Sequence, residues 1–222
     1  MTACPKLTPT EVINLKFHHQ LPPGIDIAVV CDEWAKKVEE QTSGRVKVTI
    51  YPAEGLVKAT DCYTSIVKGT CDIAFRALAN DPSRVSLNRI TDLPGMFWPS
   101  PEAASSIWVE LMDEFPEMRT EFRDVKILWQ YNCMPSVLNF TKKETRVPDD
   151  IKGMKLISLP PLSLAIDNMG ASPIGLLPPE WYTSLERGLA EGVTSAYNVI
   201  YVHKIHPLVT YRTEDEVGLM PE

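Results

Sequence analysis

Imidazole, amide and guanidinium side chains follow two apolar segments in the first third of the chain. His19 and Gln20 stand where segment 12–19 ends, and Arg76 directly follows segment 72–75. Such groups offer hydrogen-bond donors and one permanent positive charge, which suit the binding of a polar or anionic small molecule. These residue types therefore favour a binding site, provided that both segments are strands that end at the same edge of a sheet.

The first 76 residues have the pattern that would bring these side chains together. Expected strands at 12–19, 46–51 and 72–75 alternate with expected helices, the first from Asp26, as its cap, to just before Gly44 and the second over 58–68. The first helix should turn one apolar face to the sheet, made of Ile27, Val30, Trp34 and Val38. This β-α-β-α-β run predicts a doubly wound sheet, in which ligands bind beyond the carboxyl ends of the strands.

The rest of the chain alternates in the same way. A helix is expected over 101–122, with Phe115 on its apolar face, and segment 125–131 should then lead into a second sheet as part of a hinge made of strands. The remaining expected elements are a helical turn over 148–152, a strand over 155–159, a helix to about Met169, a strand over 172–177, and a helix from Pro178 that carries Trp181, Leu185 and Leu189 on one face. Short units of strand and helix predict an α/β fold with mostly parallel sheets.

Segment 148–192 and several upstream motifs resemble one known family in order and spacing. The matching stretches are Asp150-Ile151-Lys152-Gly153-Met154-Lys155-Leu156, Gly170-Ala171-Ser172-Pro173, Glu180-Trp181-Tyr182-Thr183-Ser184-Leu185, the motif at 44–52, the motif at 69–75, and Asp92-Leu93-Pro94. They resemble the signatures of the solute-binding proteins of TRAP transporters. The resemblance implies two doubly wound α/β lobes around a cleft, like the type II periplasmic binding proteins.

The same resemblance implies a function and partners. A protein of this family captures a small organic solute, with an organic acid as the expected class, when its lobes close. It then delivers the solute to the membrane components of a TRAP transporter. The resemblance implies no cofactor, no metal and no enzymatic reaction.

Several polar contacts of the family have become small or apolar residues in this chain. The arginine that pairs with the solute's carboxylate corresponds to Ile157, and a second arginine in the crossover segment corresponds to Pro135. A position that is often acidic corresponds to Ala77, and an asparagine corresponds to Ser195. Because an unpaired buried carboxylate costs several kcal/mol, the usual carboxylate clamp cannot be assumed here.

Two explanations of this departure stay open. In the first, Arg76 or a histidine at 18–19 takes over the charge, although Arg76 could equally be a solvated surface residue. In the second, the chain no longer binds the usual class of ligand. Further expected binding residues are Gln20, which aligns with a polar residue of the family, and Asn132, Pro178, Tyr197 and Asn198. Tyr197 could alternatively belong to the core.

Composition excludes several classes of function. The chain has 222 residues, 44% of them hydrophobic and 23% charged, and a net charge of −7, so nothing favours nucleic acid as a partner. No G-x-S-x-G, G-x-G-x-x-G, P-loop or H-E-x-x-H motif occurs. A nucleophile made of Cys133 and His19 would be the remaining enzymatic alternative, and only the presence of both residues supports it.

The family implies a periplasmic or extracytoplasmic location, and the sequence offers one feature that bears on it. Met1-Thr2-Ala3-Cys4 resembles the end of a lipoprotein signal, with Cys4 as the lipidated residue, followed by a spacer rich in proline and threonine. The alternative, an incidental cysteine near a terminus, stays open. Of the other cysteines, Cys31 and Cys133 are expected to be buried thiols, and Cys62 and Cys71 could pair.

We expect a tail over 1–10, a first lobe over 11–128, a second lobe over 129–210 and the start of a return segment over 211–222. The family continues further at the C-terminus, so the chain is expected to be truncated. An alternative from another class is therefore a truncated homologue that acts as an interaction domain and has no working ligand site.

Overall fold

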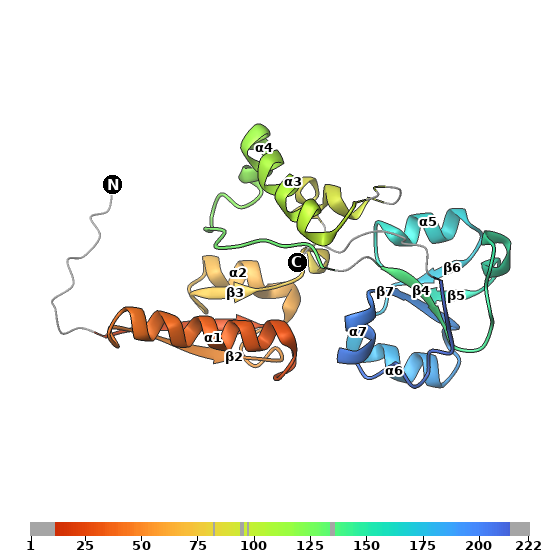
Figure 1. Cartoon of the computed structure of the whole chain (residues 1–222), viewed down its shortest axis with the longest axis horizontal. Helices are drawn as coiled ribbons and strands as arrows, with labels where there is room; N and C mark the ends of the chain where they lie inside the picture. Colours follow the sequence, from red (N-terminus) through yellow and green to blue (C-terminus); the bar gives the residue numbers. More distant parts are fainter. Residues whose placement is uncertain (1–11, 82, 94–95, 97, 134–135, 214–222) are drawn as a thin grey trace. The chain divides into compact units, whose positions relative to one another are not determined.

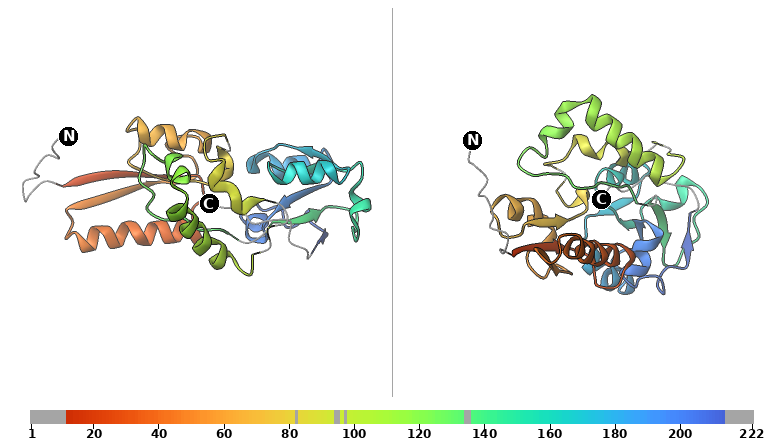
Figure 2. Two further views of the ribbon diagram at one scale, coloured as in Figure 1. Left: turned by 90° about the horizontal axis from the view of Figure 1, so that it is seen from above. Right: turned by 60° about the vertical axis from the view of Figure 1, so that its left-hand side comes forward.

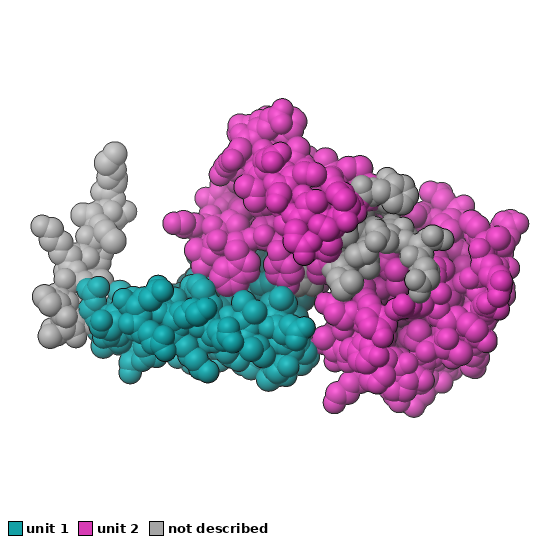
Figure 3. All heavy atoms as spheres, viewed as in Figure 1, with its two compact units in different colours: residues 1–76 teal, residues 77–222 magenta. Residues whose placement is uncertain are grey.

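The computed structural model describes residues 12–81, 83–93, 96, 98–133 and 136–213. The chain divides into two compact units, residues 1–76 (unit 1) and 77–222 (unit 2), which Figure 3 colours separately. Each unit holds an open β-sheet with helices, so the predicted α/β class is confirmed (Figure 1). The lobe boundary expected between residues 128 and 129 stays a prediction, whereas the expectation of strands in the hinge is wrong for residues 125–131, which form none.

Unit 1 is a three-stranded parallel sheet with its crossover helices. β1 (Ile13–His19) lies between β2 (Val46–Tyr51) and β3 (Ile73–Phe75). The crossovers are α1 (Asp26–Gln41) and, after the 3-10 helix η1 (Ala59–Asp61), α2 (Cys62–Val67). Figure 2 shows α1 and α2 on opposite faces of the sheet, as right-handed crossovers to opposite sides of β1 require. All three carboxyl ends therefore lie at one edge.

The buried face of α1 differs from the expected one. Ala28, Cys31 and Ala35 are its buried residues, whereas Val30 is 53% exposed, so the prediction for Val30 is wrong. The small residues let the helix approach the sheet closely, which turns Val30 outward. The expected cap is wrong too, because Ile25 occupies the N-cap and no side chain caps the helix; Asp26 lies in the first turn, where the helix dipole favours its charge.

Unit 2 begins with a helical region made of four elements. These are η2 (Leu78–Asn80), η3 (Leu87–Asp92), α3 (Pro101–Glu114) and α4 (Pro116–Thr120). The single helix expected over 101–122 is wrong, because Pro116 cannot continue the helix and Phe115 takes a non-helical conformation, φ −114° and ψ 90°. Trp108, Met112 and Met118 form a buried cluster here, while Phe115 is 47% exposed.

The second sheet has five strands in the order β6-β5-β7-β4-β8. The strands are β4 (Val137–Phe140), β5 (Lys155–Ile157), β6 (Ser172–Ile174), β7 (Gly192–Ser195) and β8 (Tyr211–Arg212). β6, β5 and β7 are parallel, whereas β4 is antiparallel to β7 and β8. The amino end of β4 therefore lies at the edge where β5 and β7 end.

Both faces of this sheet are covered by helices. On one face, Leu156 and Phe140 pack with Ile166 of α5 (Leu162–Asn168). On the other, Ile157 and Val193 pack with residues of α6 (Pro178–Glu186) and α7 (Tyr197–Val202). α6 ends at Glu186, and Leu189 is 59% exposed, so the expected placement of Leu189 on its apolar face is wrong.

The close approach of β4 to β7 explains why Gly192, the last residue of segment 148–192, is a glycine. A Cβ atom at Gly192 would lie 2.4 Å from the backbone oxygen of Asn139 on β4. No side chain fits at that distance, so the tight pairing of these two strands requires glycine there.

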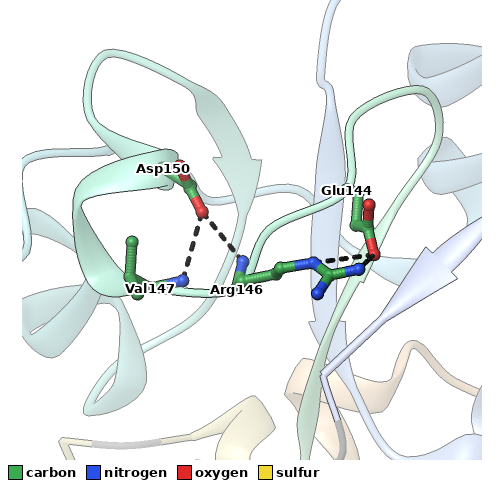
Figure 4. A network of polar contacts seen from close by, with 4 residues as sticks. All are labelled: Glu144, Arg146, Val147 and Asp150. Atoms are coloured by element: carbon green, nitrogen blue, oxygen red, sulfur yellow. Dashed lines mark hydrogen bonds and ion pairs between the residues drawn. The ribbon is translucent and has the colours of Figure 1, made fainter.

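The expected helical turn before β5 is confirmed as η4 (Pro148–Ile151). The carboxylate of Asp150 accepts hydrogen bonds from the backbone N–H groups of Arg146 (2.8 Å) and Val147 (3.1 Å) (Figure 4). These bonds lower the pKa of Asp150. Arg146 in turn donates to Glu144, 2.7 Å from Nη2 to Oε1. Asp150 thus holds the turn that leads into β5, which accounts for its place in the motif.

Candidate functional site

The carboxyl edge of the unit 1 sheet brings together the residues predicted there. His19 pairs in register with Phe75, so Gln20 and Arg76 are the residues that continue beyond two neighbouring strands. His19 is only 1% exposed, and its ring packs edge-on against Phe17 at 6.1 Å. Gln20 and Arg76 are half-buried. The edge therefore has the amide of Gln20 and the guanidinium of Arg76 that the sequence predicted. The imidazole of His19 is more deeply buried than either.

Both histidines of β1 are buried, although successive side chains of a strand point to opposite faces. Burial is the main cause that lowers the pKa of each ring, and the neighbouring His19 lowers that of His18 further. A carbonyl oxygen of Tyr51 and the charge of Glu54 act in the opposite direction on His18 but do not outweigh burial. The two imidazoles are therefore neutral at neutral pH.

Four cysteines are buried free thiols in the part of the chain that the structure describes: Cys31, Cys62, Cys71 and Cys133. Burial raises the pKa of Cys31 to about 11 and that of Cys62 to about 12, and it also raises that of Cys71. The reactive form of cysteine is the thiolate, so these three thiols are poor nucleophiles. Cys4, the expected lipidation site, lies outside the described residues.

Hydroxyl groups gather at the carboxyl edge of the unit 2 sheet. Ser158 follows β5, Ser195 ends β7, and Ser136 precedes β4; all three are at least 97% buried, with exposed fractions of 3%, 0% and 0%. Thr194 of β7 connects this strand with the end of β5. Its hydroxyl is the donor to the Ser158 Oγ at 2.9 Å and to the Ile157 oxygen at 3.3 Å. Sequence analysis predicted only Ser195 of this set.

Two polar atoms at this edge, Ser136 Oγ and Ser195 Oγ, lack hydrogen-bond partners among the described residues, as does Asn132 Nδ2 on the segment that precedes β4. Asn132 is only 3% exposed, and its other atoms are held in place. Its Oδ1 accepts from the Thr91 hydroxyl at 2.9 Å, and its backbone N–H donates to Ser105 Oγ at 2.8 Å. A buried polar atom without a partner costs free energy, which an incoming ligand could recover.

The positions at which the chain departs from the family pattern are mostly buried. Ile157 is 1% exposed and belongs to the core on the α6 side of the sheet, and Ala77 is 6% exposed. Pro135 lies outside the described residues. The side chain of Ile157 therefore fills core volume, which means that a polar anchor for a carboxylate must come from another element.

Tyr197 and Asn198 are exposed at the start of α7, just beyond Ser195. The alternative that Tyr197 belongs to the core is wrong, because the residue is 45% exposed. Its hydroxyl is 3.0 Å from that of Tyr201, and the guanidinium carbon of Arg212 lies 4.9 Å from its ring centroid. Pro178 begins α6 and is half-buried.

The remaining side chains that the sequence singled out have structural roles. Trp181 is buried, and the carboxylate of Glu180 accepts the N–H of Leu177 at 3.4 Å, as expected for an acid at a helix start. His203 caps the end of α7 and packs 5.7 Å from Trp181, whereas His206 lies beyond the helix and stacks on Tyr201. Burial lowers the pKa of His203.

Among the described residues, no group of three or more histidine, cysteine, aspartate or glutamate side chains is arranged to hold a metal ion. In the same part of the chain, every helix is too short or too polar to cross a membrane.

Comparison with known proteins identifies the family. A family model described as bacterial extracellular solute-binding protein, family 7, matches residues 17–222. The chain belongs to this family. Its resemblance to TRAP solute-binding proteins, first seen in the motifs, is thereby confirmed.

Individual relatives agree with this assignment. The outer membrane transporter protein TsaT of Comamonas testosteroni is 26% identical over 192 residues, which cover 86% of this chain and 52% of that protein. A TRAP solute-binding protein from a marine metagenome, specific for aromatic acids and solved with 3-hydroxybenzoate, is 25% identical with a TM-score of 0.86. That match covers 96% of this chain and 68% of the other.

A third relative shows the same fold with a different ligand. The TRAP periplasmic solute-binding protein of Chromohalobacter salexigens, solved with D-glucuronate, is 23% identical with a TM-score of 0.82, over 93% of this chain and 69% of the other. The chain thus spans about half of one curated relative and about two thirds of the solved structures.

Proposed function

We propose that the protein binds a small organic acid outside the cell and hands it to the membrane components of a TRAP transporter. The observation that carries the proposal is a set of buried polar atoms without partners among the described residues: Ser136 Oγ and Ser195 Oγ at the carboxyl edge of the unit 2 sheet, and Asn132 Nδ2 on the segment that precedes β4. An amide N–H and two hydroxyls can all donate to a carboxylate, which accepts hydrogen bonds only.

Two further observations support the proposal. Both solved relatives described above hold a carboxylic acid, although one is aromatic and the other a sugar acid. The group that the two ligands share is the carboxylate, so it is the part of the solute that the proposal specifies. The family and several relatives are described as solute-binding proteins, which favours this function over the alternative of an interaction domain.

No reaction forms part of the proposal. The thiols of Cys31, Cys62 and Cys71 have raised pKa values, and Cys133 is buried. A binding protein needs only to desolvate the solute and release it again, which is consistent with side chains that donate hydrogen bonds and do not transfer protons. The proposed location is periplasmic or extracytoplasmic, and lipid anchoring through Cys4 remains part of this proposal.

A thermal-shift experiment on the full 222-residue chain tests the function. The probes are 3-hydroxybenzoate, D-glucuronate and their primary amides. A ligand that binds only the folded protein raises the melting temperature by mass action, so at least one acid should give a shift that its amide does not. Equal shifts with acid and amide, or no shift with either acid, would contradict the proposal.

A further inference from the structure

A group of exposed aromatic side chains lies on α7, just beyond the carboxyl end of β7. Tyr197 and Tyr201 both belong to this helix, and both are exposed. Single apolar residues at a protein surface are common, whereas rings that gather in one place more often mark a binding surface. The place of this group, directly after a strand that ends at the candidate site, makes it a candidate for contact with the solute.

The ring of Tyr197 is held by its neighbours although it is exposed. The ring of Tyr201 meets it edge-on, with 5.1 Å between the centroids, and the two hydroxyl oxygens are 3.0 Å apart. The guanidinium carbon of Arg212 lies 4.9 Å from the Tyr197 centroid. Tyr201 is itself stacked on His206, with 4.6 Å between the centroids and 12° between the ring planes. Tyr197 therefore has one preferred orientation.

A ring that is already oriented is well suited to bind a ligand. Ordering a mobile side chain on binding costs conformational entropy, and this cost is reduced where the side chain is held beforehand. The contacts of Tyr201 and Arg212 with Tyr197 thus leave more of any stacking energy for the affinity. They act by positioning the ring.

The ring lies close to a buried hydroxyl that has no partner among the described residues, the Oγ of Ser195. Side chains two apart on a strand point to the same side, so Ser195 shares a face of the sheet with Val193, which packs with residues of α7. Arg212 lies on this face too, because it pairs in register with Asn139, which pairs with Val193. The Cα atoms of Ser195 and Tyr197 are at most about 7 Å apart, since two residues span no more.

This arrangement favours one class of acid. A carboxylate that accepts a hydrogen bond from Ser195 has the rest of its molecule within reach of the Tyr197 ring. An aromatic ring in the solute can pack on tyrosine edge-to-face or offset, which contributes affinity beyond the burial of apolar area. A saturated ring of similar size buries comparable area without this contribution.

We propose that Tyr197 stacks on the ring of an aromatic solute and makes the site prefer aromatic over saturated carboxylic acids. The inference rests on the proposed function and narrows the class of solute for the same site. The roles are divided: the buried hydroxyls and the Asn132 amide bind the carboxylate, and Tyr197 selects the organic part.

Calorimetric titration of the full chain compares 3-hydroxybenzoate with its saturated counterpart, 3-hydroxycyclohexanecarboxylate. The wild type should bind the aromatic acid about 3- to 10-fold more tightly, the range expected for one aromatic pair. Tyr197→Leu keeps an apolar side chain without a ring, so it should reduce this preference to less than about 2-fold and change the affinity for the saturated acid by less than about 3-fold. Tyr197→Phe keeps the ring and should keep the preference.

Tyr211→Leu is the matched control. Tyr211 is also an exposed tyrosine of unit 2, but it pairs in register with Phe140, whose side chain packs with α5 on the other face of the sheet. Its replacement should leave the preference for the aromatic acid unchanged.

A measurement on the wild type makes the test independent of the variants' affinities. Nuclear Overhauser contacts should join the ring protons of bound 3-hydroxybenzoate to those of Tyr197, whose signals are assigned by their absence from Tyr197→Leu. No such contact, an unchanged preference in Tyr197→Leu, or binding of D-glucuronate without binding of 3-hydroxybenzoate would overturn the assignment and leave the proposed function intact. Failure of the wild type to bind any of these acids would overturn both.

Discussion

The two sheets of the molecule carry buried polar groups at their carboxyl edges, but the groups differ in kind. In unit 1 they are the imidazoles of His18 and His19, which burial keeps neutral at neutral pH and which can gain a proton only in acid. In unit 2 they are the hydroxyls of Ser136, Ser158 and Ser195 and the amide of Asn132, which do not ionise. The edge of unit 2 can therefore hold an anion over a wide range of pH, whereas unit 1 should respond to acid.

The two sheets differ also in the elements that complete them. Unit 1 has three parallel strands, and each polar residue at its edge lies at the end of its strand or directly after it in the sequence. Unit 2 adds the antiparallel strand β4, whose amino end brings Ser136 to the edge. The polar residues at the edge of unit 1 can therefore be found from their positions beside predicted strands, whereas those at the edge of unit 2 are harder to find in this way.

The largest expected effect tests whether the two units are separate. Phe17 of β1 and Phe140 of β4 are both fully buried, so Phe17→Ala and Phe140→Ala should each cost about 3–5 kcal/mol of folding free energy. Hydrogen exchange measured by mass spectrometry should show faster exchange in strands 13–75 for the first variant and in strands 137–212 for the second. Equal acceleration in both units by either variant would contradict the division.

Thr194 and Ser195 allow a comparison between a hydroxyl that makes hydrogen bonds within the protein and one that has no partner among the described residues. Thr194→Val removes two hydrogen bonds and should lower the free energy of unfolding by about 1–3 kcal/mol. Ser195→Ala removes a buried hydroxyl that has no partner among the described residues, so its change should be within about 0.5 kcal/mol of zero. Urea denaturation measures both. A large loss in Ser195→Ala would mean that its hydroxyl already has a structural partner.

Because of its buried histidines, we expect unit 1 to be destabilised by acid more than unit 2. Burial lowers the pKa of His18 and His19 below the ordinary value of 6.5, so the unfolded chain binds protons at a higher pH than the folded one. Their stabilising contribution is therefore complete above 6.5 and decreases as the pH falls below it toward the folded pKa values. Burial also lowers the pKa of His203 in unit 2, but unit 1 has two such histidines next to each other, so it should lose more.

Hydrogen exchange at about pH 7.5 and about pH 5 checks this prediction. His19→Gln should reduce the acid sensitivity of unit 1, and His206→Gln, at an exposed position, should not change it. Equal acid sensitivity of unit 1 in the wild type and in His19→Gln would contradict the account of the imidazoles.

The smallest expected effect concerns the turn before β5. Asp150→Asn weakens two hydrogen bonds to backbone N–H groups and should lower the melting temperature slightly, whereas Asp149→Asn removes only an exposed pair with Lys152 and should not. Because the pKa of Asp150 lies below 3.8, its contribution is present above that value and is lost as the pH falls through the folded pKa. Equal melting temperatures of the two variants at neutral pH would contradict this role.

The strands and helices were predictable where proline, glycine and alternation mark them. Strand 46–51 was predicted at its observed bounds, and the turn before β5 was also found. β4 was missed, because its four residues have an apolar pattern too short to indicate a strand on their own. Val30 and Leu189 were misplaced because helical spacing alone does not show which side of a helix meets the sheet or where the helix ends.

The site was less predictable than the fold. Ser195 and Asn132 were named from the resemblance to the family, and their roles remain proposals. The hydrogen bond from Arg89 to the Pro160 oxygen could not be inferred from spacing, because the two residues are 71 positions apart and the segment around Arg89 follows no strand or helix period. Contacts of this kind depend on how η3 folds back onto the loop after β5.

An NMR titration of the full chain with 3-hydroxybenzoate and D-glucuronate tests the central claim most directly, because backbone amide signals report where the acid binds. The account predicts that the signals perturbed most by a binding acid include those of Asn132, Ser158 and Ser195, at the carboxyl edge of the unit 2 sheet. Perturbations confined to the β1 and β3 edge of unit 1, or none with either acid, would contradict it.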